Sequence, residues 1–155
     1  ADEPCAAQIA AAVKKEERKG HAVETTTALR HVIEGVLSGL PEKEKKETVK
    51  KTCQRVFQAL RIDVNSEFEV LDAFLEKLPS VLKPGGRVAV LTFHSGEDRM
   101  VKKSFKRLAR EGVYQEISTD VIRPSAEECY QNGRARSTKM RWAIRSHDGG
   151  EEVVR

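Results

Sequence analysis

The stretch that most constrains this chain is KPGGRVAVLTFHSGEDR, residues 83–99, because it combines a helix exit, an apolar strand and a new helix start. Pro84, Gly85 and Gly86 predict a turn, since proline cannot continue a helical ladder and glycine accepts a positive φ. The apolar run 88–91 is continuous rather than alternating, which is typical of a strand covered on both faces in a parallel α/β sheet. We therefore predict that this strand lies at the centre of a sheet.

Polar residues follow the predicted strand directly. Ser95 and Asp98 have the spacing of a capping box, so Ser95 is the expected N-cap of a helix that begins near Gly96. Ligands of open α/β sheets bind in the crevice outside the carboxyl ends of the strands. His94 and Ser95 are adjacent, and adjacent strand residues rarely face each other, so a hydrolase pair of these two is disfavoured. His94 is expected to be a hydrogen-bonded orienting residue at the strand end. The residues expected at this crevice are His94, Ser95, Asp98 and Arg99.

Composition indicates a globular α/β protein and excludes several classes. The 155 residues are 39% hydrophobic and 34% charged, and no apolar run approaches the roughly 18 residues of a membrane span. The three cysteines are far apart and form no CxxC pair, which argues against a disulfide framework and against a zinc site. A reducing compartment fits this pattern. The first residue is alanine, which favours a processed or truncated product with further sequence upstream.

The net charge of +4 is unevenly spread along the sequence. Residues 99–145 hold twelve Lys or Arg against five Asp or Glu, so this segment carries +7 and the remainder carries −3. A basic segment of this kind is suited to contact phosphates, and it is also compatible with an ordinary solvated face. Charge alone leaves both interpretations open.

The first part of the chain predicts a helical hairpin. A helix is expected from Pro4 to Gly20, and a second one follows the N-cap candidates at 25–27 and ends near residues 39–41. The run 42–51 is almost entirely charged, which favours an exposed linker or a solvated helix start over a binding site and predicts a subdomain boundary near residue 45.

The remainder predicts a three-layer α/β arrangement. The expected elements are a helix that contains FQALRI, a break at 65–67, a helix up to Pro79, the strand at 88–91, a helix to Arg110, a strand at 113–117, a short helix at 126–130 capped by Ser125, and a last strand at 139–144. The predicted divisions are a helical subdomain at 1–45, an α/β domain at 46–147 and a frayed tail at 148–155.

Four ordered segments resemble a known family. FQALRI followed by Val64-Asn65, then LKPGGRVAVLTFHSGEDRMVKKSF at 82–105, IRPSAEE at 122–128 and RARSTKMR at 134–141 are similar to the bacterial-type ribosomal RNA cytosine-N4 methyltransferases known as MraW. The resemblance covers nearly the whole chain, because residues 1–40 are similar to the end of that family's helical insertion. The chain departs from the usual motifs at Val56, where a threonine is usual, and at Gly96, where a leucine is usual. A third departure is the mixed run 42–51, which stands where the family's connection before FQALRI is normally basic.

The resemblance implies a class I, Rossmann-like fold that uses S-adenosylmethionine, with a helical subdomain inserted in it. This chain resembles the part from inside the insertion to the C-terminus. In that fold the strand 87–91 lies between the last strand and a strand that this chain lacks, so we expect it to pair with the last strand on one side and to have an unpaired edge on the other. The implied activity is methyl transfer to the N4 amine of a cytidine in small-subunit ribosomal RNA. The family's glycine-rich cofactor motif lies upstream of the resembling part, so the S-adenosylmethionine site is expected mostly outside this chain and its residues stay unassigned.

The resemblance also suggests site residues and partners. The active-site wall is expected to contain Arg61, Asn65, His94, Ser95 and Arg99. The expected phosphate contacts are Lys102, Lys106, Arg134, Arg136 and Lys139. The implied partners are small-subunit ribosomal RNA and either a missing N-terminal half or a second copy of the chain, in the bacterial cytoplasm or an organellar matrix. The alternative is a non-catalytic RNA-binding or ribosome-assembly protein derived from a methyltransferase.

Overall fold

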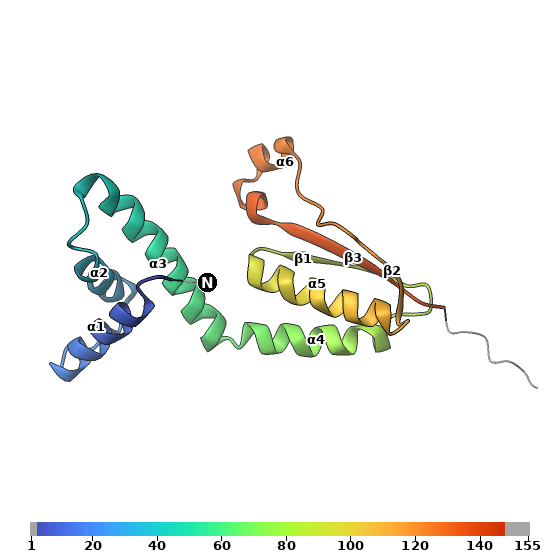
Figure 1. The fold of residues 1–155 in the computed structure, drawn as a ribbon, viewed down its shortest axis with the longest axis horizontal. Coiled ribbons are helices and arrows are strands. Elements are labelled where there is room, and N and C mark those ends of the chain that lie inside the picture. Colours follow the sequence, from blue (N-terminus) through green and yellow to red (C-terminus); the bar gives the residue numbers. More distant parts are fainter. Residues whose placement is uncertain (1–2, 148–155) are drawn as a thin grey trace, which may run out of the picture. The chain divides into compact units, whose positions relative to one another are not determined.

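The computed structural model describes residues 3–147, which form two compact units that divide between Glu67 and Phe68 (Figure 1). The predicted frayed tail at 148–155 lies outside the described residues. Each unit has a hydrophobic core of its own, so each is described by itself.

The first unit is a bundle of three helices, α1 (Ala6–Arg18), α2 (Thr26–Val36) and α3 (Glu42–Val64). Its core consists of buried aliphatic side chains from the three helices and from the C-cap residue of α2, namely Ile9, Ile33, Val49 and Leu37. The predicted cap of α2 is confirmed, because the Thr25 hydroxyl accepts a hydrogen bond of 3.1 Å from the Ala28 backbone N–H. The predicted helical hairpin is therefore present.

Helix α3 passes without interruption through the charged run at 42–51, so this run is a solvated helix start rather than a linker. The compact unit extends to Glu67, beyond the boundary predicted near residue 45. The division into an inserted subdomain and a methyltransferase domain stays a prediction. The predicted break after FQALRI is confirmed, because α3 ends at Val64, Asn65 is its C-cap and Ser66 adopts a positive φ of 48°.

The second unit is an α/β layer with a small sheet. Its elements are α4 (Glu67–Val81, its first residue at the boundary), β1 (Arg87–Thr92), α5 (Ser95–Arg110), β2 (Tyr114–Ile117), α6 (Ala126–Gln131), a 3₁₀ helix η1 (Gly133–Ser137) and β3 (Lys139–Arg145). Figure 1 shows α5 running along the sheet with α4 beside it. The predicted order of helices and strands is confirmed, and the additional element is η1.

The strand order is β1-β3-β2, and both outer strands run antiparallel to β3. The predicted pairing of β1 with the last strand is confirmed, with Val88 opposite Ala143 and Val90 opposite Arg141. The expected unpaired edge of β1 is also confirmed for the described residues, because β3 is its one neighbour there. The prediction of a strand covered on both faces at the centre of a parallel sheet is wrong for these residues, because the pairing is antiparallel and Leu91 is 59% exposed. The apolar run indicated a strand, but it carries no information on strand direction or on how many neighbours the strand has.

The core of the second unit joins α4, α5 and the sheet. It is built from Leu75, Leu78, Val101, Phe105, Leu108, Tyr114 and Ala143. Phe105 and Tyr114 meet edge to face, with ring centroids 5.5 Å apart, an arrangement that the aromatic quadrupoles favour. The turn before β1 is confirmed as well, with Gly85 at a φ of 70°. This core fixes the position of α5 against the sheet.

We predict that Tyr114→Phe leaves the protein equally stable or more stable, by up to about 1 kcal/mol. The Tyr114 hydroxyl is buried without a hydrogen-bond partner among the described residues, and burial raises its pKa. Urea unfolding of the two proteins measures the difference. Tyr114→Ala is the contrasting variant and is expected to cost about 3–5 kcal/mol through lost packing. A loss of more than about 1 kcal/mol in the Phe variant would show that the hydroxyl has a stabilising partner.

Candidate functional site at the carboxyl end of β1

The N-cap of α5 is His94, so the prediction that Ser95 and Asp98 form the capping box is wrong by one residue. The His94 Nδ1 atom accepts hydrogen bonds from the backbone N–H groups of Gly96 at 3.2 Å and Glu97 at 3.4 Å. The Glu97 carboxylate accepts in return from the backbone N–H groups of Phe93 at 2.9 Å and His94 at 3.3 Å. The spacing of three residues fits both pairs, and the histidine pair wins because its ring nitrogen and the longer glutamate both reach the backbone.

The His94 ring is held from several sides. Its side chain is only 15% exposed, and its Nε2 atom lies 3.4 Å from Glu97 Oε1. Phe68 packs against it edge to face, with centroids 5.8 Å apart. A Cβ atom at Gly96 would lie 2.8 Å from the Phe68 ring, so the glycine makes room for this contact. His94 therefore orients the start of α5, as predicted for a hydrogen-bonded residue at the strand end.

Ser95 and three cations form one exposed stripe along α5. Ser95 is the first residue of the helix and is exposed. At about 100° per residue, the stripe spans an arc of roughly 60°. Its members, in chain order, are Ser95, Arg99, Lys102 and Lys106. The structure therefore brings part of the predicted active-site wall and part of the predicted phosphate contacts onto one face.

A buried ion pair ties the first turn of α5 to β3. Arg141 donates two hydrogen bonds to the Asp98 carboxylate, at 2.7 and 3.2 Å, and the two side chains are 7% and 16% exposed. Burial by itself raises the pKa of Asp98, but the hydrogen bond and charge of Arg141, with Lys139 and Lys102 nearby, outweigh burial and lower it. The carboxylate also lies in the first turn of a helix, where negative charge is favoured.

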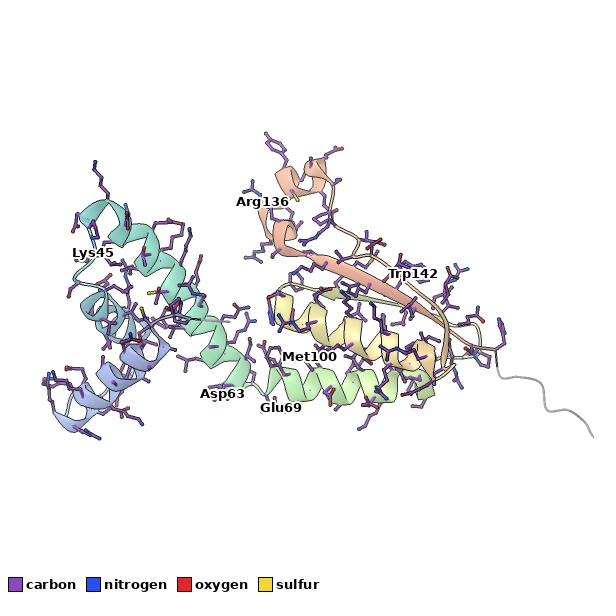
Figure 2. The ribbon with its side chains drawn as sticks, viewed as in Figure 1. Lys45, Asp63, Glu69, Met100, Arg136 and Trp142 are labelled. Carbon is purple, nitrogen blue, oxygen red and sulfur yellow. The ribbon has the colours of Figure 1, made fainter. Side chains whose placement is uncertain are left out.

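A second basic group lies on η1, where Arg136 is labelled in Figure 2. Arg134 and Arg136 are exposed on either side of Ala135, which is buried. The short helix before them is capped as predicted, since the Ser125 hydroxyl accepts from the Glu128 backbone N–H at 3.1 Å. Lys139 follows at the start of β3 and is half-buried. Because Ala135 packs inward, the arginines on either side of it are exposed to solvent.

Arg61 and Asn65 belong to the first unit. The Arg61 guanidinium donates to both Glu67 carboxylate oxygens, at 2.9 and 3.2 Å, and Asn65 is the C-cap of α3. Of the five predicted wall residues, the structure thus brings together His94, Ser95 and Arg99. That Arg61 and Asn65 complete the same wall stays a prediction.

The model of the MraW methylase family matches residues 1–146 of this chain. The chain belongs to the MraW methylase family. It is 65% identical over 145 residues to ribosomal RNA small subunit methyltransferase H 1 of Agathobacter rectalis, covering 94% of this chain and 42% of the relative. The corresponding protein of Lachnoclostridium phytofermentans is 66% identical over 94% of this chain and 40% of its own length. Methyltransferase H 2 of Acholeplasma laidlawii is 50% identical over 94% and 42%.

The chain therefore spans about two fifths of the length of these curated relatives. Their names describe methyltransferases of small-subunit ribosomal RNA, in agreement with the resemblance found from the sequence motifs. No helix in residues 3–147 combines the length and the apolar character that a membrane crossing would require.

Two exposed aromatic residues, one inside a MraW-family motif and one between two of the motifs, were not identified as site residues from the sequence. Phe93 is 57% exposed next to His94, and Tyr130 is 90% exposed on α6, which packs against η1. The available signal was position, since each aromatic residue lies within a few residues of a predicted site residue. Hydropathy offered no help because it favours burial of both side chains.

We predict that Asp98→Asn lowers the free energy of unfolding by about 3 kcal/mol at neutral pH, because it leaves the Arg141 charge buried without its counter-ion. The folded pKa of Asp98 is lowered, so its contribution to stability is present above the unfolded pKa of about 3.9 and is lost as the pH falls through the folded pKa. Urea unfolding between neutral and acidic pH measures both effects.

Asp120→Asn, at an exposed position, is the control for this prediction and is expected to change little. The double variant Asp98→Asn with Arg141→Met is expected to cost less than the sum of the single variants, because no unpaired charge remains. Equal stability of Asp98→Asn and the parent protein at neutral pH would contradict the assignment.

Proposed function

We propose that this chain is the C-terminal part of a class I methyltransferase that transfers the methyl group of S-adenosylmethionine to the N4 amine of a cytidine in small-subunit ribosomal RNA. The observation that carries the proposal is the family match along residues 1–146, together with relatives named as methyltransferases of this RNA. Because all three relatives are bacterial, the proposed compartment is the bacterial cytoplasm.

The chemistry requires positioning above all. The exocyclic amine of cytosine is a poor nucleophile because its lone pair is delocalised into the ring, so the enzyme has to align it with the sulfonium methyl group. In this proposal the His94 cap and the Asp98–Arg141 pair hold the start of α5 in place. Ser95 and Arg99 then offer a hydroxyl and a cation at the end of β1, and Arg61 and Asn65 complete the wall.

The RNA backbone is proposed to lie against the two basic groups of the second unit. One is the exposed stripe on α5 with Lys102 and Lys106, and the other is the group of Arg134, Arg136 and Lys139. Exposed cations bind phosphates through release of counter-ions. Tyr130, the exposed aromatic residue on α6, is suited to stack on an unpaired base, since aromatic faces accept any base.

S-adenosylmethionine is proposed to bind mainly to the remainder of the enzyme, outside this chain. The edge of β1 supports this division, because β1 pairs with β3 alone within the described residues and the backbone groups along its other side are available for pairing. One face of the strand is uncovered as well, since Ala89 and Leu91 are exposed. The proposed partner of this edge is the N-terminal part of the enzyme. In its absence, a second copy of the chain would take the same place.

The test is reconstitution of methyl transfer. The chain is purified alone and also joined to the remaining part of the Agathobacter rectalis relative, and each protein is incubated with S-adenosylmethionine and small ribosomal subunits. Digestion of the RNA and mass spectrometry of its nucleosides are expected to show N4-methylcytidine with the joined protein only. Methylation of another atom would contradict the proposed reaction, and RNA binding without any methylation by the joined protein would favour the non-catalytic alternative.

We predict that Arg134→Gln with Arg136→Gln weakens RNA binding across sequences and reduces the slope of log K against log salt concentration by about 1.4 on single-stranded RNA, or about 0.7 for each lost phosphate contact. Fluorescence anisotropy titrations at several salt concentrations measure the slope. Lys83→Gln with Arg87→Gln is the charge-matched control at the other end of β1, where both side chains are exposed. An unchanged slope in the arginine variant would remove these residues from the RNA interface.

A further inference from the structure

The first unit contains a cavity of about 620 Å³ between α2 and the first half of α3. This volume falls in the range of ligand pockets, which is about 300–1,000 Å³. Its lining residues are Thr26, Thr27, Arg30, Lys46, Val49, Lys50, Cys53, Gln54 and Phe57, called here the α2–α3 groove. The lining contains three cations and no carboxylate, whereas each of two other large cavities of this unit is lined by at least one glutamate.

Within the described part of the chain, two of the three cations lack ionic partners. Arg30 is paired with Glu34 at 2.7 Å, but Lys46 and Lys50 form no ion pair within residues 3–147. They are four residues apart on α3, so they lie on the same face about 6 Å apart along the axis. Like charges at this spacing weaken a helix slightly, and a bound anion would remove that repulsion.

The floor and the rim of the groove differ in character. Val49 is buried, and Cys53 and Phe57 are half-buried, so the floor is apolar and holds one aromatic ring. Thr27, Gln54 and the two lysines are exposed at the rim and supply hydroxyl, amide and ammonium groups. Cations along a groove with an aromatic face inside it are the combination by which proteins hold single-stranded nucleic acid without reading its sequence.

We propose that the α2–α3 groove binds a single strand of RNA, with successive phosphates on Lys46 and Lys50 and one base against Phe57. The inference rests on the proposed function and extends it to the first unit, which then holds an unpaired segment of the substrate RNA. An acidic peptide would also meet the lysines, but it would leave the aromatic floor without a matching group. The aromatic ring therefore favours RNA.

The test uses the whole chain and an unstructured, fluorescein-labelled oligouridylate of about ten nucleotides. Lys46→Gln with Lys50→Gln is expected to reduce the slope of log K against log salt concentration by about 1.4, or about 0.7 for each lost phosphate contact. The matched control is Lys43→Gln with Lys51→Gln, which removes the same charge from exposed positions of the same helix turns outside the groove. The control is expected to change the slope by less than about 0.5.

Phe57→Leu separates stacking from charge. It is expected to weaken binding by about tenfold and to leave the salt slope unchanged, because it removes one base contact and no cation. Circular dichroism and thermal unfolding check that the bundle is intact. If this variant unfolds, the lysine variants decide the question, since both lysines are exposed and their replacement leaves the core untouched.

Three outcomes overturn the inference. These are equal slopes for the groove and control variants, competition by polyglutamate as strong as that by unlabelled oligouridylate, or no binding of the oligonucleotide by the parent chain. If the slope falls for Arg134→Gln with Arg136→Gln but not for the groove variant, the groove assignment fails while the proposed RNA function stands. Methyl transfer by the joined protein tests that function independently of the groove.

Discussion

The ion pair of Asp98 and Arg141 is the constraint on which the arrangement of the second unit depends. It joins the first turn of α5 to β3, and β3 is the strand that pairs with both of its neighbours. The pair is almost completely buried, so removal of either partner would leave a charge in a poorly solvated place. Together with the His94 cap it fixes the direction in which α5 leaves the end of β1.

The cations of the second unit fall into two groups, those paired within the unit and those exposed to solvent. Arg141 is neutralised inside the unit, and Arg107 is paired with Glu76 and Glu111 at the far end of α5. Arg99, Lys102 and Lys106 lie on another face of that helix and are exposed. The excess of positive charge is thus divided between cations that stabilise the fold and cations that are suited to bind phosphates.

The first unit is held together by apolar packing and has much of its charge on one helix. Its core is a small set of aliphatic side chains, and the long helix α3 carries most of its charge in its first half, which also contributes Val49 to this core. That half forms one wall of the α2–α3 groove. A helix that is apolar on one side and basic on the rim of a cavity is suited to bind single-stranded nucleic acid. Its cations can contact the phosphates and its apolar side can contact the bases.

From the residues alone we could predict the order of the elements, the turn before β1, the caps at Thr25 and Ser125 and the family, because each depends on local residue types or on ordered motifs. Tertiary structure decided the rest. His94 displaced Ser95 as the cap because the spacing fits both and only the geometry of the ring separates them. The antiparallel pairing of β1 could not be predicted from its apolar run, because hydrophobicity indicates burial and not strand direction. The burial of Arg141 could not be predicted, because its counter-ion Asp98 lies 43 residues away in the sequence and no local pattern connects the two residues.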